Sequence, residues 1–221
     1  MNSFVFEASA VIFDFDGVIL ESVKVKTDAF KELFSDYPEH LEAIVAYHEN
    51  NMGISRYHKF AWIYQELLGI MLSPNEEKRL GQQFSALVME KLLACPFVPG
   101  TLELLEELKH RGIPAFIASG TPQNELELLV QRRGLASYFQ EVWGSPAEKP
   151  EIIERLIAAY ELDRNRLYFI GDALSDYIAA KTTGIRFIGR KTPMSALCWE
   201  PYRVPWVHDL RELIEVETKA T

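Results

Sequence analysis

Residues 10–17 read Ala-Val-Ile-Phe-Asp-Phe-Asp-Gly and decide the fold of this 221-residue chain. The apolar run has the length and β-rich composition of a buried strand, and Gly17 marks its end. Side chains alternate along an extended backbone, so we expect Asp14 and Asp16 to share one face. In a parallel sheet both would lie at the carboxyl end of the strand, where open α/β sheets bind ligands. Neighbouring like charges are costly unless a cation or a reaction uses them, so this stretch indicates a cation-binding or catalytic site.

Composition excludes several classes of protein. Hydrophobic residues make up 48% of the chain and charged residues 25%, which is typical of a globular protein with a sizeable core. The net charge of −9 argues against nucleic acid or an anionic membrane as a partner. Residues 1–7 lack the basic start of a signal peptide, and no apolar run reaches transmembrane length, so we expect a cytoplasmic protein. Cys95 and Cys198 are expected to be buried thiols, and a monomer or a small homo-oligomer would fit this composition.

The pattern of apolar residues changes along the chain. Residues 22–95 carry helical spacing almost throughout, and Ser73 with Pro74 and Glu76 reads as a helix start. After Pro99 the pattern alternates, with strands expected at 113–118, 138–143, 167–170 and 185–188, and helices at 101–111, 122–133, 151–160 and 174–182. This alternation predicts an α/β fold with a doubly wound, parallel, Rossmann-like sheet. We therefore expect a catalytic core of residues 1–21 and 96–221, interrupted by an α-helical cap at 22–95.

Three further polar clusters follow predicted strands. Ser119-Gly120-Thr121 offers a hydroxyl and free backbone N–H groups at a helix start, which suits an anion or an ordinary helix cap. Lys149 follows the strand near residue 140, where a solvated lysine is the common case. Asp172 and Asp176, four residues apart in a tight turn, suit a cation or a helix cap. Each cluster is ambiguous alone, but all of them stand at strand ends.

In this order the four clusters resemble the motifs of the haloacid dehalogenase superfamily. The resemblance is to its phosphatase branch, with the helical cap of β-phosphoglucomutase and phosphoglycolate phosphatase relatives. The motif Asp-x-Asp-Gly-Thr/Val is matched by residues 14–18, and the Ser or Thr that ends a strand is matched by Ser119. The lysine often followed by proline is matched by Lys149, and Gly-Asp-x-x-x-Asp is matched by residues 171–176.

The resemblance implies an Mg²⁺-dependent phosphatase that acts on a small phosphorylated metabolite, either a sugar phosphate or a phosphorylated acid. Asp14 would be the nucleophile that forms an aspartyl-phosphate, and Asp16 the general acid and base. The implied catalytic residues are Asp14, Asp16, Ser119 and Lys149; the implied substrate-binding residues are Gly120, Thr121 and Arg56. The implied Mg²⁺ ligands are Asp14, the backbone carbonyl of Asp16, Asp172 and Asp176.

Other positions bear on the specificity of such an enzyme. The segment from Gly53 to Arg56 resembles a cap segment of β-phosphoglucomutase relatives, in which the arginine reaches a distal phosphate; a surface arginine is the alternative. Glu21 stands where Asp is common, and Lys26 stands where relatives often have His. Lys26 lies near the hinge, where a solvated helix position is favoured and a position facing the pocket is the alternative. The five histidines lack ligand spacing and are read as structural or surface residues.

Two other functions stay open on the sequence. A mutase of the β-phosphoglucomutase type would return the phosphoryl group to a sugar and would need a bisphosphate. A non-catalytic relative would use the pocket or the cap to bind a protein. The acid at Asp16 favours phosphate esters, because dehalogenases and phosphonatases of this superfamily lack an acid there.

Overall fold

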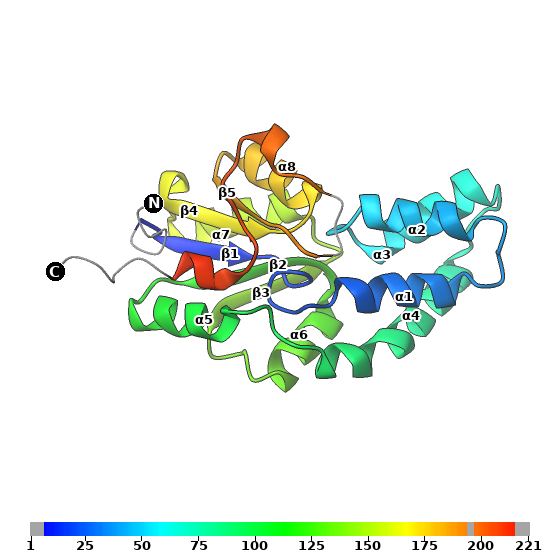
Figure 1. Ribbon diagram of the computed structural model, residues 1–221, viewed down its shortest axis with the longest axis horizontal. Coiled ribbons are helices and arrows are strands. Elements are labelled where there is room, and N and C mark those ends of the chain that lie inside the picture. The colour runs from blue at the N-terminus through cyan, green and yellow to red at the C-terminus, as the bar shows by residue number, and fades with distance from the viewer. Residues whose placement is uncertain (1–6, 194–196, 215–221) are drawn as a thin grey trace.

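The structure is a computed structural model that describes residues 7–193 and 197–214. Six parallel strands form one sheet in the order β3-β2-β1-β4-β5-β6 (Figure 1). The strands are β1 (Ala10–Phe13), β2 (Ala115–Pro122), β3 (Phe139–Ser145), β4 (Leu167–Gly171), β5 (Arg186–Arg190) and β6 (Trp206–Val207). From β1 the chain first adds strands on one side of the sheet (β2, β3) and then on the other (β4, β5, β6). Parallel sheets bind ligands in the crevice at such a switch point, which here lies at the end of β1. The predicted α/β fold is confirmed.

Helices cover both faces of the sheet because its strands are apolar on both sides. Val11 and Phe13 pack with α5 (Thr101–His110) and α6 (Gln123–Arg132), whereas Ala10 and Ile12 face the opposite layer. That layer consists of α7 (Lys149–Tyr160) and α8 (Leu174–Thr183). In Figure 1, α8 lies above the sheet and α5 below it.

A group of helices between β1 and β2 lies at the end of the sheet where β1 ends (Figure 1, right). It contains α1 (Val23–Leu33), α2 (Leu41–Asn50), α3 (Arg56–Trp62), a π-helical turn (Ile63–Leu67) and α4 (Pro74–Ala94). Its interior is aromatic: Phe30 packs edge-on against Phe84 at 5.0 Å between ring centroids, and Phe60 is fully buried beside both. Ser73 caps α4 by accepting a hydrogen bond from Glu76 N at 3.2 Å, as predicted. The cap boundaries at residues 22 and 95 stay a prediction.

The C-terminal tail completes the sheet. Trp199 is fully buried against β5, and a Cβ atom on Gly189 would lie 2.6 Å from the indole ring, so the ring uses the space that glycine leaves open. Trp206 and Val207 then pair with β5 as the edge strand β6. Cys95 is buried as predicted, but the same prediction for Cys198 is wrong, because this thiol projects outward beside Glu200.

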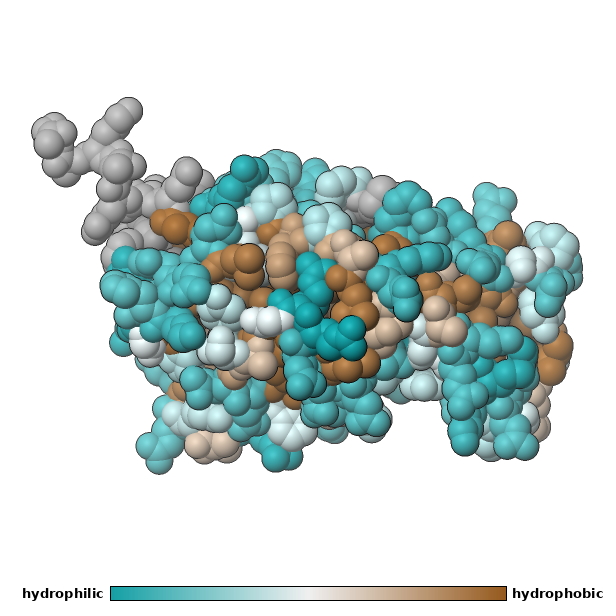
Figure 2. All heavy atoms as spheres, turned by 90° about the horizontal axis from the view of Figure 1, so that it is seen from below, coloured by the Kyte–Doolittle hydropathy of each residue, from teal (hydrophilic) through white to brown (hydrophobic). Residues whose placement is uncertain are grey.

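The surface of the molecule is largely polar. Figure 2 shows hydrophilic residues spread over the face seen from below, with apolar residues in smaller groups between them. Within the described part of the chain, no helix combines the length and the apolar character that crossing a membrane requires. The prediction about a signal peptide concerns residues 1–7, of which 1–6 lie outside the described residues.

Candidate active site

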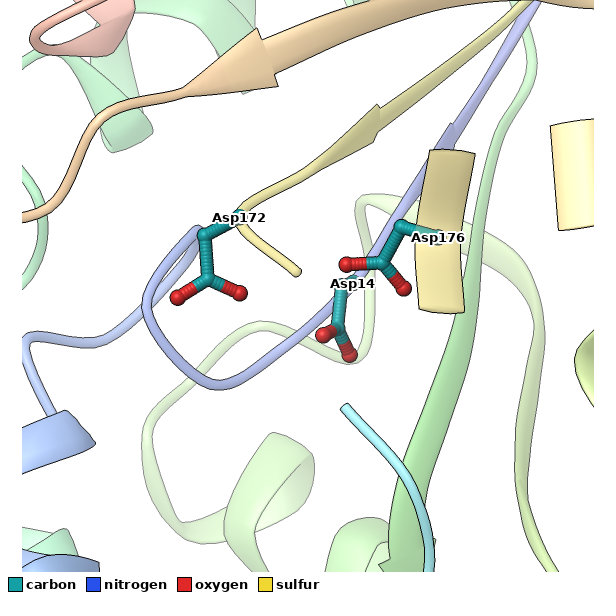
Figure 3. Close-up of side chains that lie close together, drawn as sticks. All are labelled: Asp14, Asp172 and Asp176. Atoms are coloured by element: carbon teal, nitrogen blue, oxygen red, sulfur yellow. The ribbon is translucent and has the colours of Figure 1, made fainter. Parts of the chain in front are cut away.

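Three buried carboxylates meet at the carboxyl ends of β1 and β4. Asp14 follows β1, Asp172 follows β4 and Asp176 lies in the first turn of α8. One oxygen from each lies within 4.8 Å of the others, and each residue is at most 2% exposed. Figure 3 shows the three side chains turned toward a common space. In the sequence, Asp14 lies more than 150 positions before Asp172 and Asp176, and the parallel sheet brings it together with them.

The loop after β1 is shaped by a glycine. β1 ends at Phe13, so Asp14 and Asp16 lie in the following turn, where Gly17 N donates to Leu20 O at 2.8 Å. Gly17 has φ +72°, and a Cβ atom there would lie 2.1 Å from Asp172 Oδ2, so only glycine fits. The two residues follow the strand instead of lying in it, and both line one pocket, although their carboxylates contact different partners.

Lys149, at the start of α7, provides the positive charge of the cluster. Its ammonium lies 3.1 Å from Asp14 Oδ2 and donates a hydrogen bond to Asp176. Burial favours the neutral amine, but the adjacent carboxylates Asp14 and Asp176 outweigh it and raise the pKa of Lys149 above its usual value. The side chain is therefore charged and buried, unlike the common solvated lysine, and its catalytic role stays a prediction.

The three carboxylates nevertheless carry more negative charge than Lys149 can balance. Burial raises the pKa of Asp14 to about 7 despite Lys149, with Asp176 and Asp16 adding repulsion. Burial and the charge of Asp14 raise the pKa of Asp172 well above its usual value. Among the described residues, Asp14 Oδ2 and Asp172 Oδ2 are buried without a hydrogen bond of good geometry. Buried carboxylate oxygens with no well-aligned hydrogen bond, in a set of three carboxylates, are the donors that a hard divalent cation takes, so the residues fit Mg²⁺.

The Asp16 carboxylate points away from this cluster. It accepts hydrogen bonds from Ser22 Oγ at 2.7 Å, from Thr121 Oγ1 at 2.7 Å and from the Lys26 ammonium. Burial alone would raise the pKa of Asp16, but Lys26 and these hydrogen bonds lower it below its usual value. Asp16 is thus ionised here and held by a network that joins the core to α1.

The segment Ser119-Gly120-Thr121 forms the end of β2 and lines the same pocket as Asp14, Asp16 and Asp172. Ser119 Oγ accepts a hydrogen bond from Thr121 N at 3.2 Å, and both side chains are buried. A Cβ atom on Gly120 would lie 2.8 Å from Gly53 O, so the loop before α3 packs directly on this segment. The predicted phosphate-binding residues are therefore gathered in one place, while their role stays a prediction.

The helices close this pocket from the other side. Its lining from the helical region consists of Val23, Lys26, Phe30, His48, Met52, Gly53, Ile54, Arg56, Lys59 and Phe84, and the cavity volume is about 60 Å³. Arg56 is buried, forms an ion pair with Glu125 of α6 and donates to Ser85 Oγ at 3.1 Å. Ser85 Oγ donates to Glu125 at 2.6 Å, so these three residues fasten α4 to the core. Arg56 lies at the pocket as the sequence suggests, and its substrate-binding role stays a prediction.

Two features of the pocket differ from the sequence expectations. Lys26 was expected in solvent, but it reaches inward to Asp16 and Thr121 because α1 presents this face to the core. Lys59 was not singled out at all, although it stands three residues after Arg56 on one helix and therefore shares its face. Its ammonium lies 3.1 Å from Nδ1 of His48, a buried residue of α2.

Metal binding should be detectable without any assay of activity. We expect Mg²⁺ to raise the unfolding temperature, by the equivalent of roughly 2.7 kcal/mol at a hundredfold excess over Kd. The pKa of Asp14 is about 7 and that of Asp172 is raised, so protons compete with the cation at low pH. The stabilisation should therefore grow between about pH 5 and about pH 8, as measured by thermal unfolding at each pH.

Asp172→Asn should lose this response, whereas Asp36→Asn, which changes an exposed aspartate of the helical region, should keep it. A response that is equal in both variants, or absent from the parent protein at every pH, would contradict the metal site.

Comparison with known proteins agrees with this geometry. Residues 11–190 match the model of the haloacid dehalogenase-like hydrolase family. A phosphoglycolate phosphatase of Synechococcus elongatus is 26% identical over 185 residues, covering 80% of each chain. A phosphorylated carbohydrates phosphatase of Thermotoga maritima is 29% identical over 189 residues, covering 81% of this chain and 83% of the relative.

Solved structures share the fold. A hydrolase from Pseudomonas syringae superposes with a TM-score of 0.77 at 19% identity, covering 93% of this chain and 95% of that one. The predicted class, a phosphatase-type hydrolase with an inserted helical region, is confirmed. The family match spans most of the chain, from β1 to the end of β5. The chain therefore belongs to the haloacid dehalogenase-like hydrolase family.

Proposed function

We propose that this protein is an Mg²⁺-dependent phosphatase that hydrolyses a small phosphorylated metabolite through an aspartyl-phosphate on Asp14. One observation carries the proposal: polar residues at or near the ends of three strands line a single pocket, and Lys149 at the start of α7 contacts Asp14 beside it. Relatives named as phosphatases of phosphoglycolate and of phosphorylated carbohydrates support the substrate class. The small cavity favours a compact leaving group.

In the first step a carboxylate oxygen of Asp14 attacks phosphorus, and the bond from phosphorus to the ester oxygen breaks. The leaving oxygen takes a proton from Asp16, which must therefore bind a proton before this step. Ser119 and the backbone N–H of Gly120 hold the phosphoryl oxygens, and Lys149 balances the charge that grows on them. Lys149 also fixes the orientation of Asp14 by its contact at 3.1 Å.

In the second step a water molecule attacks phosphorus, and the bond between phosphorus and Asp14 breaks. Asp16 accepts the proton of this water, for which its ionised form is ready, and inorganic phosphate leaves. When bound by Asp14, Asp172, Asp176 and the Asp16 carbonyl, Mg²⁺ offsets the repulsion between the carboxylates and an anionic ester.

A panel of phosphomonoesters assayed for phosphate release with Mg²⁺ tests the proposal. We expect turnover of small phosphorylated acids or sugars, and its loss when EDTA removes the metal. Turnover that appears only when a sugar bisphosphate is added, with the phosphoryl group recovered on sugar, would indicate a mutase instead. Absence of hydrolysis across a broad panel would contradict the phosphatase and favour a binding protein.

A further inference from the structure

Three cations of the helical region line the pocket, and two of them have a carboxylate partner. Lys26 forms an ion pair with Asp16, and Arg56 forms one with Glu125. For Lys59, no carboxylate oxygen of the described residues lies within 4.0 Å of the ammonium, and the residue as a whole is 4% exposed. Lys59 therefore brings a charge into the pocket that no carboxylate within ion-pairing distance balances.

The groups in direct contact with the Lys59 ammonium are neutral. His48 offers Nδ1 at 3.1 Å and its backbone carbonyl at 3.4 Å, and the Phe30 ring centroid lies 5.5 Å away. Burial, together with Lys59 and Lys26, lowers the pKa of His48 to about 2, so this imidazole is uncharged. Since an ammonium can only donate, Nδ1 accepts and the ring hydrogen lies on Nε2. His48 thus orients Lys59 without neutralising it.

This arrangement costs stability. Burial and the neighbouring Lys26 lower the pKa of Lys59 to about 7, which means that the fold disfavours its charged form. An unpaired buried cation is among the costly features of a protein interior, and binding sites are where such costs are tolerated. An anion beside Lys59 would remove the penalty. The negative charges of Asp16 and Asp172, which line the same pocket, favour the charged form of Lys59. An anion bound inside the pocket, where the substrate would lie, would favour it further.

We propose that Lys59, oriented by His48, binds a carboxylate on the leaving group of the substrate and so selects phosphorylated hydroxy acids over uncharged phosphate esters. The inference rests on the proposed phosphatase function and names its substrate class. A carboxylate fits better than a second phosphate, because the cavity is about 60 Å³ and a lysine supplies one point charge. The planar fork that suits phosphate belongs to Arg56, whose charge Glu125 balances.

The test compares phosphoglycolate with the monophosphate of ethylene glycol, which has the same length but ends in a hydroxyl. For the parent protein we expect a higher kcat/KM on phosphoglycolate. Lys59→Met should reduce this preference at least about tenfold and leave kcat/KM on the uncharged ester within about threefold. Lys59→Arg should keep part of the preference. Lys24→Met, an exposed lysine of α1, is the matched control and should change neither substrate.

Removal of the buried charge should also raise the unfolding temperature of Lys59→Met, which shows that the variant folds. Equal losses on both substrates would mean a structural role and would overturn the inference, as would an unchanged preference. A preference for ethylene glycol bisphosphate that depends on Lys59 would overturn the choice of a carboxylate. Failure of the parent protein to release phosphate from either monoester, and from the wider panel, would instead refute the proposed function, and the inference with it.

Discussion

We expect Asp16→Asn to lower kcat on an alkyl phosphate such as phosphoglycolate by about 10²–10⁴-fold, the contribution of one general acid and base. An asparagine can neither protonate the leaving oxygen nor accept the proton of the attacking water. The fold should persist, because the amide keeps the size of the carboxylate: its oxygen accepts from one of the Ser22 and Thr121 hydroxyls and its NH2 group donates to the other. Steady-state phosphate release measures the loss, with Asp28→Asn, an exposed acid of α1, as the control.

The same variant separates the two steps. p-Nitrophenyl phosphate has a leaving group that departs without a proton, so Asp16→Asn should still complete the first step on this substrate. The second step should stall, and stopped-flow absorbance should show a burst of one nitrophenolate per enzyme. Normal turnover of phosphoglycolate by Asp16→Asn would refute the role of this residue.

Asp14→Asn should reduce kcat by about 10⁴-fold or more on every substrate, whatever its leaving group, because no second nucleophile lies at this position. The variant should also be more stable than the parent protein in EDTA. Burial raises the folded-state pKa of Asp14 to about 7, above its ordinary value of 3.8. Its ionisation therefore destabilises the fold: the stability that Asp14 contributes is complete below about pH 4 and is lost as pH rises through 7.

Thermal unfolding in EDTA measures this difference. The gain in unfolding temperature of Asp14→Asn over the parent protein should be larger at about pH 8 than at about pH 5. A gain that is independent of pH would show that Asp14 is not the group that titrates. Residual activity within tenfold of the parent protein would exclude Asp14 as the nucleophile.

Much of the site could be predicted because a parallel sheet has a simple rule. Asp14 and Asp172 follow the ends of their strands and Ser119 lies in the last half of β2, and parallel strands bring such positions to one edge. Local patterns also gave the start of α4 at Ser73 and the alternation of strands and helices after residue 99. The strand ends and the helix start are set by short segments of sequence, and the parallel sheet fixes how the strand ends are grouped.

The rest depends on how the helices sit against the core. Lys26 reads as an exposed helix position, and only the packing of α1 turns it toward Asp16. The partners of Arg56 and Lys59 lie on other elements, Glu125 on α6 and His48 on α2, and no local spacing identifies such pairs. Residues that contact the leaving group of a substrate also come from separate elements of the helical region. The sequence motifs therefore predict the type of reaction more readily than the identity of the substrate.

The most direct measurement looks for the phosphoryl group on Asp14 itself. The protein is mixed with substrate and Mg²⁺, quenched in acid within the first turnover, digested, and analysed by mass spectrometry. The account predicts that the peptide containing Asp14 gains the mass of one phosphoryl group, on that residue, in Mg²⁺ but not in EDTA. Steady release of phosphate while Asp14 stays unmodified, in the parent protein and in Asp16→Asn, would contradict it.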